Sequence, residues 1–299
     1  MTIFQSLQQS QAAFTMVCFS LGLLVGSFLN VIIYRLPRML QVDLRRQCCE
    51  FLRLEDPLST DEENSLFWTN LSLAQPPSHC PQCKHKIRAW ENIPLISYAL
   101  LCGECANCKV RIPVRYPAVE LATGLLSALV AVNFSATWLT LALLLFVWAL
   151  IALTMIDFDH QLLPDNITLP LLWLGLAVNT LDFGNGVTTQ ESVLGAAVGY
   201  LSLWSFYWVF KLATGKDGMG YGDFKLLAAL GAWMGWQALL PIILISSLAG
   251  VTFGVSSTLL LGRDKSAPMP FGPFLAGAGL IMMIWGHQIY SFYITRFLL

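Results

Sequence analysis

Long apolar segments alternate with short polar ones over most of the chain, and this pattern predicts membrane helices. Eight segments reach or approach the about 20 apolar residues that a helix needs to cross a bilayer. Two of them, 167–181 and 224–234, are short, so we expect them to be tilted or partly re-entrant. The predicted helices are Ala12–Tyr34, Val114–Phe134, Trp138–Ile156, Ile167–Leu181, Val193–Phe210, Phe224–Met234, Leu239–Leu261 and Phe271–Ile294. The predicted fold class is an all-α integral membrane protein with about eight transmembrane helices.

A long polar insert separates the first apolar segment from the second. The chain is 56% hydrophobic and only 12% charged, whereas soluble domains carry about 25% charged residues. Of its 17 Lys and Arg residues, 11 lie between Arg35 and Arg115. We therefore divide the chain into a first transmembrane helix at 1–37, an insert at 38–113 and a seven-helix transmembrane domain at 114–299.

Basic residues predict the orientation of these helices. The first apolar segment has no basic residue before Arg35, so we interpret it as a retained helix with its N-terminus outside, and not as a cleaved signal peptide. Threading eight helices then gathers every Lys and Arg except Arg296 in, or at helix ends beside, the segments on one side: the insert and the loops 157–165, 211–223 and 262–270. Because basic residues accumulate on the cytoplasmic side, the insert is predicted to be cytoplasmic.

Four of the eight cysteines form two C-x-x-C pairs in the insert. The first lies in the sequence CPQCKHKI and the second in CANCKVRI, so both follow the pattern C-x-x-C-K-x-[K/R]-I. Two such pairs with a spacer of about 20 residues indicate a tetrahedral zinc site. The predicted zinc ligands are Cys80, Cys83, Cys105 and Cys108. Four cysteine ligands leave no open coordination position, so this zinc is expected to be structural.

Cys102 competes for this site, because it forms a second C-x-x-C pair with Cys105. It does not fit the repeated pattern, and we interpret it as a free thiol beside the metal. His79 and His85 flank the first pair and remain minor alternatives as ligands. A redox C-x-x-C motif is disfavoured, since it would normally occur once and near a βαβ pattern. Structural disulfides are equally disfavoured in a cytoplasmic segment.

Carboxylates at helix ends are the candidate catalytic groups, because ionisable residues in or beside membrane helices are costly to keep there. One predicted helix runs into Asp157, and another begins at Asp223 after the alternating glycines Gly218, Gly220 and Gly222. Glycine permits positive φ and lets backbone or substrate approach closely. Both carboxylates lie at predicted cytoplasmic ends, where they can form a pair that shares a proton. Taken singly, each also fits an ordinary helix-end charge.

Four stretches of the sequence resemble the type IV prepilin peptidases, the bifunctional leader peptidase/N-methyltransferases of type IV pilus and type II secretion systems. The first looks like the N-terminal signature of that family, the second like its zinc loop, and the others like its two aspartate motifs. In chain order they are Gly26–Pro37, His79–Glu120, Ile156–Asp157 with Pro164–Asp165, and Gly220–Lys225. The resemblance covers nearly the whole chain.

This resemblance implies a multi-pass aspartyl peptidase of the cell inner membrane, which cleaves the leader from prepilins and pilin-like secretion proteins at the cytoplasmic face. It places the catalytic aspartates at Asp157 and Asp223, not at Asp159 or Asp165, and the metal at the same four cysteines. It also implies methylation of the new N-terminus by S-adenosylmethionine, although the sequence has no G-x-G-x-x-G fingerprint. The expected partners are these substrates and membrane lipid, with no nucleic acid. Lys225 is expected to face phospholipid headgroups, with an electrostatic role in the aspartate pair as the alternative.

Three alternative functions fit parts of the pattern. A transporter would use the two aspartates as a proton relay, and it predicts carboxylates near the bilayer midplane and often repeated halves. A non-catalytic zinc module on a membrane scaffold explains the cysteines but gives the glycine-flanked Asp223 no role. A presenilin-like protease also uses a Gly-x-Gly-Asp sequence, but the four-cysteine insert points away from it.

Overall fold

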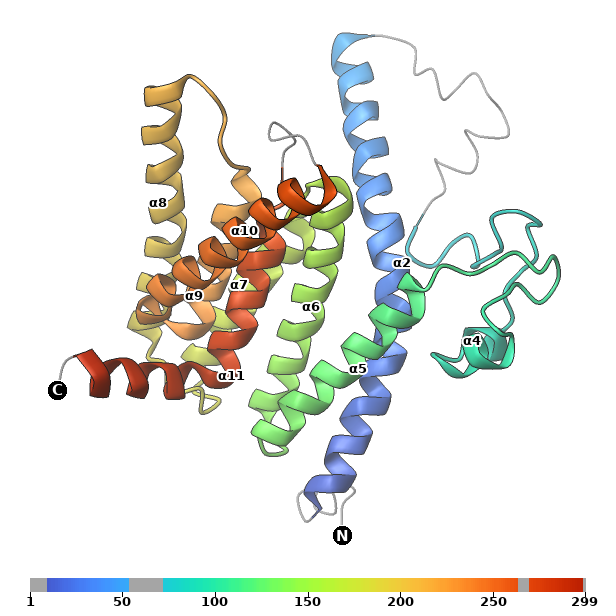
Figure 1. Cartoon of the computed structure of the whole chain (residues 1–299), viewed down its shortest axis with the longest axis horizontal. Coiled ribbons are helices and arrows are strands. Elements are labelled where there is room, and N and C mark those ends of the chain that lie inside the picture. Colours follow the sequence, from blue (N-terminus) through green and yellow to red (C-terminus); the bar gives the residue numbers. More distant parts are fainter. Residues whose placement is uncertain (1–9, 54–71, 263–268, 298–299) are drawn as a thin grey trace. The chain divides into compact units, whose positions relative to one another are not determined.

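The computed structural model describes residues 10–53, 72–262 and 269–297, and most of these residues are in helices (Figure 1). No strand occurs in the described ranges, where β pairing is limited to two isolated bridges in the insert. The α-helices are α2 (Gln11–Leu52), α4 (Ile96–Leu100), α5 (Arg115–Asn133), α6 (Trp138–His160), α7 (Asp165–Thr180), α8 (Thr189–Thr214), α9 (Tyr221–Met234), α10 (Leu239–Leu261) and α11 (Gly272–Phe297). Short 3-10 turns occur at η2 (Ala89–Asn92) and η3 (Trp236–Ala238). Each of the eight predicted membrane helices coincides with one of these α-helices.

Within the described residues, five helical segments are long and apolar enough to cross a membrane: Gln11–Leu52, Arg115–Asn133, Trp138–His160, Thr189–Thr214 and Trp236–Leu260. The expected class, an all-α membrane protein, is confirmed. α7 has 16 residues and α9 has 14. At 1.5 Å per residue, each is shorter than the hydrocarbon core of about 30 Å. The two segments that were expected to be short are therefore short helices.

The chain forms two compact units, Met1–Val132 and Asn133–Leu299. In the first unit, α2 continues to Leu52, well past the boundary at residue 37 that was expected for the first membrane helix. Pro37 lies inside α2, where it removes one backbone hydrogen bond but does not end the helix. The residues that follow include good helix formers such as Leu, Arg and Gln. The division of the chain at residues 37 and 113 stays a prediction.

Small residues bring α2 and α5 together within the first unit. A Cβ atom on Gly22 would lie 2.5 Å from the Ser127 hydroxyl, and one on Gly26 would lie 2.8 Å from the Glu120 Cα. Close backbone approach through small residues is typical of helix pairs in membranes, where lipid supplies no hydrophobic drive for association. These glycines therefore explain why the two helices pack side by side.

The short helix α9 forms the core of the second unit. Nearly every residue from Asp223 to Trp233 is buried. α8 packs so closely that a Cβ atom on Gly195 would collide with the Gly231 carbonyl of α9. On the α7 side, the Trp233 indole donates a 2.9 Å hydrogen bond to the Leu171 carbonyl. A helix that is apolar all round belongs inside a protein, so α9 is enclosed by its neighbouring helices.

Candidate active site and candidate metal centre

Asp157 and Asp223 lie at helix ends within the second unit. Asp157 is in the last turn of α6, which ends where Gln161 adopts a left-handed conformation with φ 52°. Asp223 is in the first turn of α9, which follows the N-cap residue Gly220. Both are buried, with exposures of 5% and 8%. The two carboxyl groups are close enough for a direct electrostatic interaction. The fold therefore brings the two predicted catalytic residues into one site.

The hydrogen bonds at this aspartate pair do not satisfy all of its carboxylate oxygens. Asp157 Oδ2 accepts a 2.9 Å hydrogen bond from the backbone N–H of Gly272, at the start of α11. The Asp223 carboxylate accepts a hydrogen bond from the backbone of Gly220. Its Oδ1 atom, however, is buried and has no hydrogen-bond partner in the described part of the chain. A buried oxygen without a hydrogen-bond partner lowers the stability of the fold. Such an unsatisfied atom is typical of a functional group.

The other two aspartates of the first motif differ from this pair. Asp159 and Asp165 are both exposed to solvent, whereas Asp157 is buried. Asp165 begins α7, where it accepts hydrogen bonds from the Lys225 ammonium at 2.7 Å to each carboxylate oxygen. Lys225, which was expected to face headgroups, is thus paired with a residue 60 positions away. Burial therefore separates the two candidate catalytic aspartates from their neighbours.

Glycines at the site serve close approach. Positive φ and close approach were the two properties expected of the alternating glycines before Asp223. None of the three adopts a positive φ. A Cβ atom on Gly222 would lie 2.7 Å from the Leu163 Cβ, and one on Gly272 would lie 2.7 Å from Asp157 Oδ2. Leu163 also reaches Gly272, since its Cδ2 would lie 3.1 Å from that added Cβ. One leucine therefore packs between the α9 glycine and the glycine that binds Asp157.

Neither Gly272 nor Leu163 was among the predicted site residues. Gly272 precedes Pro273, and proline is favoured in the first turn of a helix. This Gly-Pro step is a local signal for the start of α11. Nothing in the local sequence indicates that the freed N–H would bind a carboxylate 115 positions earlier.

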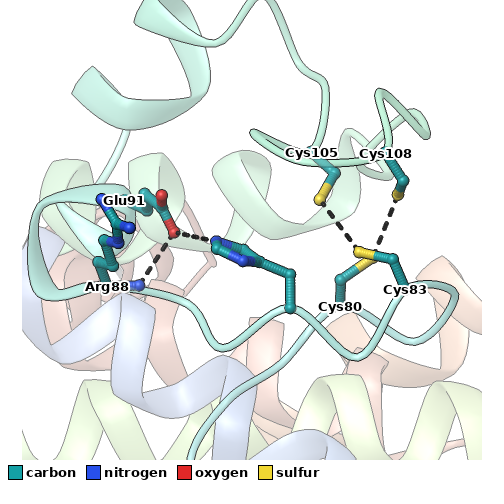
Figure 2. A network of polar contacts seen from close by, with 7 residues as sticks. Cys80, Cys83, Arg88, Glu91, Cys105 and Cys108 are labelled. Atoms are coloured by element: carbon teal, nitrogen blue, oxygen red, sulfur yellow. Dashed lines mark hydrogen bonds and ion pairs between the residues drawn. The ribbon is translucent and has the colours of Figure 1, made fainter.

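The second candidate site is the cysteine cluster in the first unit (Figure 2). The Sγ atoms of Cys80 and Cys108 are 3.7 Å apart, and those of Cys83 and Cys105 are 4.0 Å apart. All four sulfur atoms lie within 4.8 Å of one another. Cys102 is exposed and does not belong to this group. Such spacing fits a single metal ion with four thiolate ligands.

The two knuckles share one backbone geometry, as their repeated sequence suggested. Cys80 N–H donates to the His85 carbonyl, and Cys105 N–H donates to the Val110 carbonyl, each at 2.9 Å. The lysine that follows each C-x-x-C pair adopts a positive φ, 55° in the first knuckle and 59° in the second. An isolated antiparallel bridge closes each knuckle, His79 with Lys86 and Glu104 with Arg111.

Backbone N–H groups favour the thiolate form that a metal requires. The pKa of Cys83 is lowered to about 6, chiefly by a backbone hydrogen bond from His85. The pKa of Cys105 is also lowered, chiefly by a backbone hydrogen bond from Cys108. The His85 side chain instead lies beside Glu91, with its Nε2 atom 3.3 Å from the Glu91 carboxylate oxygen Oε2. This histidine is therefore engaged away from the sulfur atoms, and the donor set suits a four-cysteine metal site.

Two charged side chains from the helices of the first unit hold the cysteine-bearing segment. Buried Arg35 of α2 donates to the backbone carbonyls of Ser72, Leu73 and Pro76, with distances of 2.8, 3.4 and 2.7 Å. From α5, the Glu120 carboxylate accepts the Leu95 N–H at 2.9 Å. The segment is thus tied to its own unit by side chains that the cysteine motifs do not include.

Both halves of the chain match models of known protein families. The family model for the bacterial peptidase A24 N-terminal domain matches residues 20–134, and that for the type IV leader peptidase family matches residues 144–255. A prepilin leader peptidase/N-methyltransferase of Stutzerimonas stutzeri is 52% identical over 98% of each chain. The chain belongs to the type IV leader peptidase family. Similar relatives of the same name occur in Pseudomonas aeruginosa, at 50% identity over 98% of each chain, and in Dichelobacter nodosus, at 46% over 97%.

These matches confirm the family that the sequence motifs indicated. They also confirm the expected class of enzyme, a membrane aspartyl peptidase that is also an N-methyltransferase. Neither the transporter nor the non-catalytic zinc module is supported by any of them. No solved structure matches the chain.

Proposed function

We propose that this enzyme removes the N-terminal leader from type IV prepilins and pilin-like secretion proteins, with Asp157 and Asp223 as its catalytic pair. The observation that carries the proposal is the buried pair itself, in which Asp223 Oδ1 has no partner among the described residues. A proton shared between the carboxylates, or a water between them, would satisfy this oxygen. The names of the relatives supply the substrate class.

Two carboxylates held close share one proton more readily than they both ionise. The ionised member takes a proton from water as the water oxygen attacks the scissile carbonyl carbon. The protonated member donates its proton to the carbonyl oxygen, which gives a neutral tetrahedral intermediate. Collapse of this intermediate breaks the C–N bond, and the leaving amine takes up a proton. The pair titrates as a unit, and water is the only co-reactant.

We place the insert and the catalytic pair on the cytoplasmic side of the inner membrane. The support is the distribution of basic residues, since cytoplasmic loops carry an excess of Lys and Arg. In this orientation a prepilin keeps its apolar helix in the lipid while its leader reaches the aspartates. Reporter fusions near positions 60, 187 and 299 should then read inside, outside and outside. A signal from outside the cytoplasm at position 60 would overturn this orientation.

We propose zinc as the metal of the four-cysteine cluster. Cys80, Cys83, Cys105 and Cys108 would hold the ion, and the backbone hydrogen bonds that favour the thiolates of Cys83 and Cys105 suit it. With every coordination position filled by cysteine, zinc would contribute folding free energy to the segment between α2 and α5 and would take no part in peptide hydrolysis.

Methyl transfer is the second activity, and S-adenosylmethionine is the methyl donor that we propose for it. The acceptor is the amine that leader removal has just released, so cleavage must come first. In this transfer the donor carbon–sulfur bond breaks as the new carbon–nitrogen bond forms, and the amine loses a proton. The insert and the adjoining helix ends are the proposed location, because the N-terminal domain model of the family covers them.

One incubation tests both activities. Purified enzyme is mixed with a prepilin, with and without S-adenosylmethionine, and the product is weighed by mass spectrometry. We expect loss of the leader mass in both samples and a further gain of one CH2 group only with the methyl donor. Intact prepilin would contradict the peptidase, whereas cleavage without methylation at saturating donor would leave a peptidase alone.

A further inference from the structure

The ion pair between Asp165 and Lys225 joins two helices that meet at the candidate active site. Asp165 begins α7, and Lys225 lies in the first turns of α9, two residues after Asp223. The Lys225 ammonium lies 2.7 Å from both oxygens of Asp165, and the two residues are 60 positions apart. By contrast, the ion pair of Lys211 with Asp217, at 2.8 Å, joins the end of α8 to the loop that directly follows it.

The segment between Asp157 and Asp165 connects the two carboxylate-bearing helices through this ion pair. Its first residues are the end of α6, so Asp157 moves with it. Its middle is fixed by Leu163, which is buried against Gly222 and Gly272. Its last residue is held by Lys225 on α9. The connection between the two aspartates is therefore fixed at both ends and in the middle.

The ion pair has little effect on stability, because it is open to water. Its side chains are 28% and 51% exposed, and exposed ion pairs contribute little to the free energy of folding. Its geometric effect is larger. A single ammonium that binds both oxygens of one carboxylate restricts how the start of α7 can move relative to the start of α9.

We propose that the Asp165–Lys225 ion pair is a positioning device, which holds the turn after Asp157 against the start of the Asp223 helix and so sets the separation of the two catalytic carboxylates. This proposal rests on the proposed peptidase function of the pair. Neither Asp165 nor Lys225 contacts substrate in this role, and each acts through the aspartate beside it.

Loss of the ion pair should slow the chemical step and leave substrate binding intact. Small displacements of catalytic groups can cost up to about 100-fold in rate. We expect Asp165→Asn and Lys225→Met each to lower kcat for prepilin cleavage about 10-fold, with KM within about twofold of wild type. Lys225→Arg keeps a charged partner for Asp165, so it should retain most of the wild-type kcat.

Asp217→Asn is the matched control, because it removes an ion pair of similar length that is more exposed and does not link the two helices. It should cleave within about twofold of wild type. The proposal is wrong if both test variants cleave normally, if KM rises while kcat holds, if only the lysine variant is slow, or if Asp217→Asn is equally slow. Asp223→Asn, measured alongside, separates the two proposals. If Asp223→Asn cleaves normally, the proposed catalytic pair is wrong. If Asp223→Asn is inactive while Asp165→Asn and Lys225→Met cleave normally, only the proposed positioning role is wrong.

Discussion

The cysteine cluster and the carboxylate pair are built in opposite ways. Each cysteine knuckle is local: its C-x-x-C pair, its left-handed lysine and its closing bridge lie within about ten residues. The carboxylate pair is not local, because Asp157 and Asp223 come from different helices and meet through the packing of α6, α9 and α11. The spacing of the cysteines in the sequence therefore predicts the metal centre, whereas the active site depends on the packing of helices throughout the second unit.

The two sites also differ in how completely their polar groups are satisfied. The four cysteine sulfur atoms are mutual neighbours, and those of Cys83 and Cys105 accept backbone hydrogen bonds. In the carboxylate pair, Asp223 Oδ1 is buried without a partner. A satisfied donor set suits a structural metal, whereas an unsatisfied buried oxygen suits a group that must bind and release a proton or water. The difference implies that changes at the two sites should have separable effects.

The largest effect should follow replacement of either catalytic carboxylate. Asp157→Asn and Asp223→Asn keep the side-chain shape but remove acid–base chemistry, so each should lower prepilin cleavage by about 10²- to 10⁴-fold. Metal content and membrane insertion should stay at wild-type levels, since neither residue belongs to the cysteine cluster. Asp159→Asn is the comparison variant and should cost far less. An inactive Asp159→Asn with an active Asp157→Asn would show that the wrong aspartate had been chosen.

A smaller loss should follow from adding one methyl group beside Asp157. In Gly272→Ala the new Cβ would lie 2.7 Å from Asp157 Oδ2, so the carboxylate must move. We expect cleavage to fall about 10- to 100-fold. Gly277→Ala in the same helix is the matched control, because its Cβ would meet nothing within 4 Å. Equal cleavage by the two alanine variants would contradict the contact between Gly272 and Asp157.

The smallest effect on cleavage should come from the metal centre. Cys80→Ser or Cys105→Ser should release the metal and make the segment between α2 and α5 more sensitive to protease, because metal binding contributes to its folding. Cleavage should fall less than in the aspartate variants, since the carboxylates belong to the other compact unit. Metal analysis and limited proteolysis test this, with Cys102→Ser as the control. Metal loss in Cys102→Ser equal to that in Cys105→Ser would show that the ligand register is wrong.

The lengths of the apolar segments located the eight helices and their approximate bounds, because apolar length is a direct requirement of the bilayer. It did not indicate that α2 continues to Leu52, since helix propensity persists where hydropathy ends. The repeated knuckle sequence indicated which cysteines cluster, because their contacts are local. Gly272, Leu163 and the Asp165–Lys225 ion pair could not be inferred, because each acquires its role only when helices distant in sequence pack together.

The central claim is that Asp157 and Asp223 act as one catalytic unit, and a double-variant comparison tests it most directly. Single-turnover cleavage of a prepilin is measured for Asp157→Asn, Asp223→Asn and the variant with both changes. Residues that act as a unit are strongly non-additive, so the double variant should cleave about as slowly as either single one. Single losses that multiply in the double variant, or normal cleavage by either single variant, would contradict the claim.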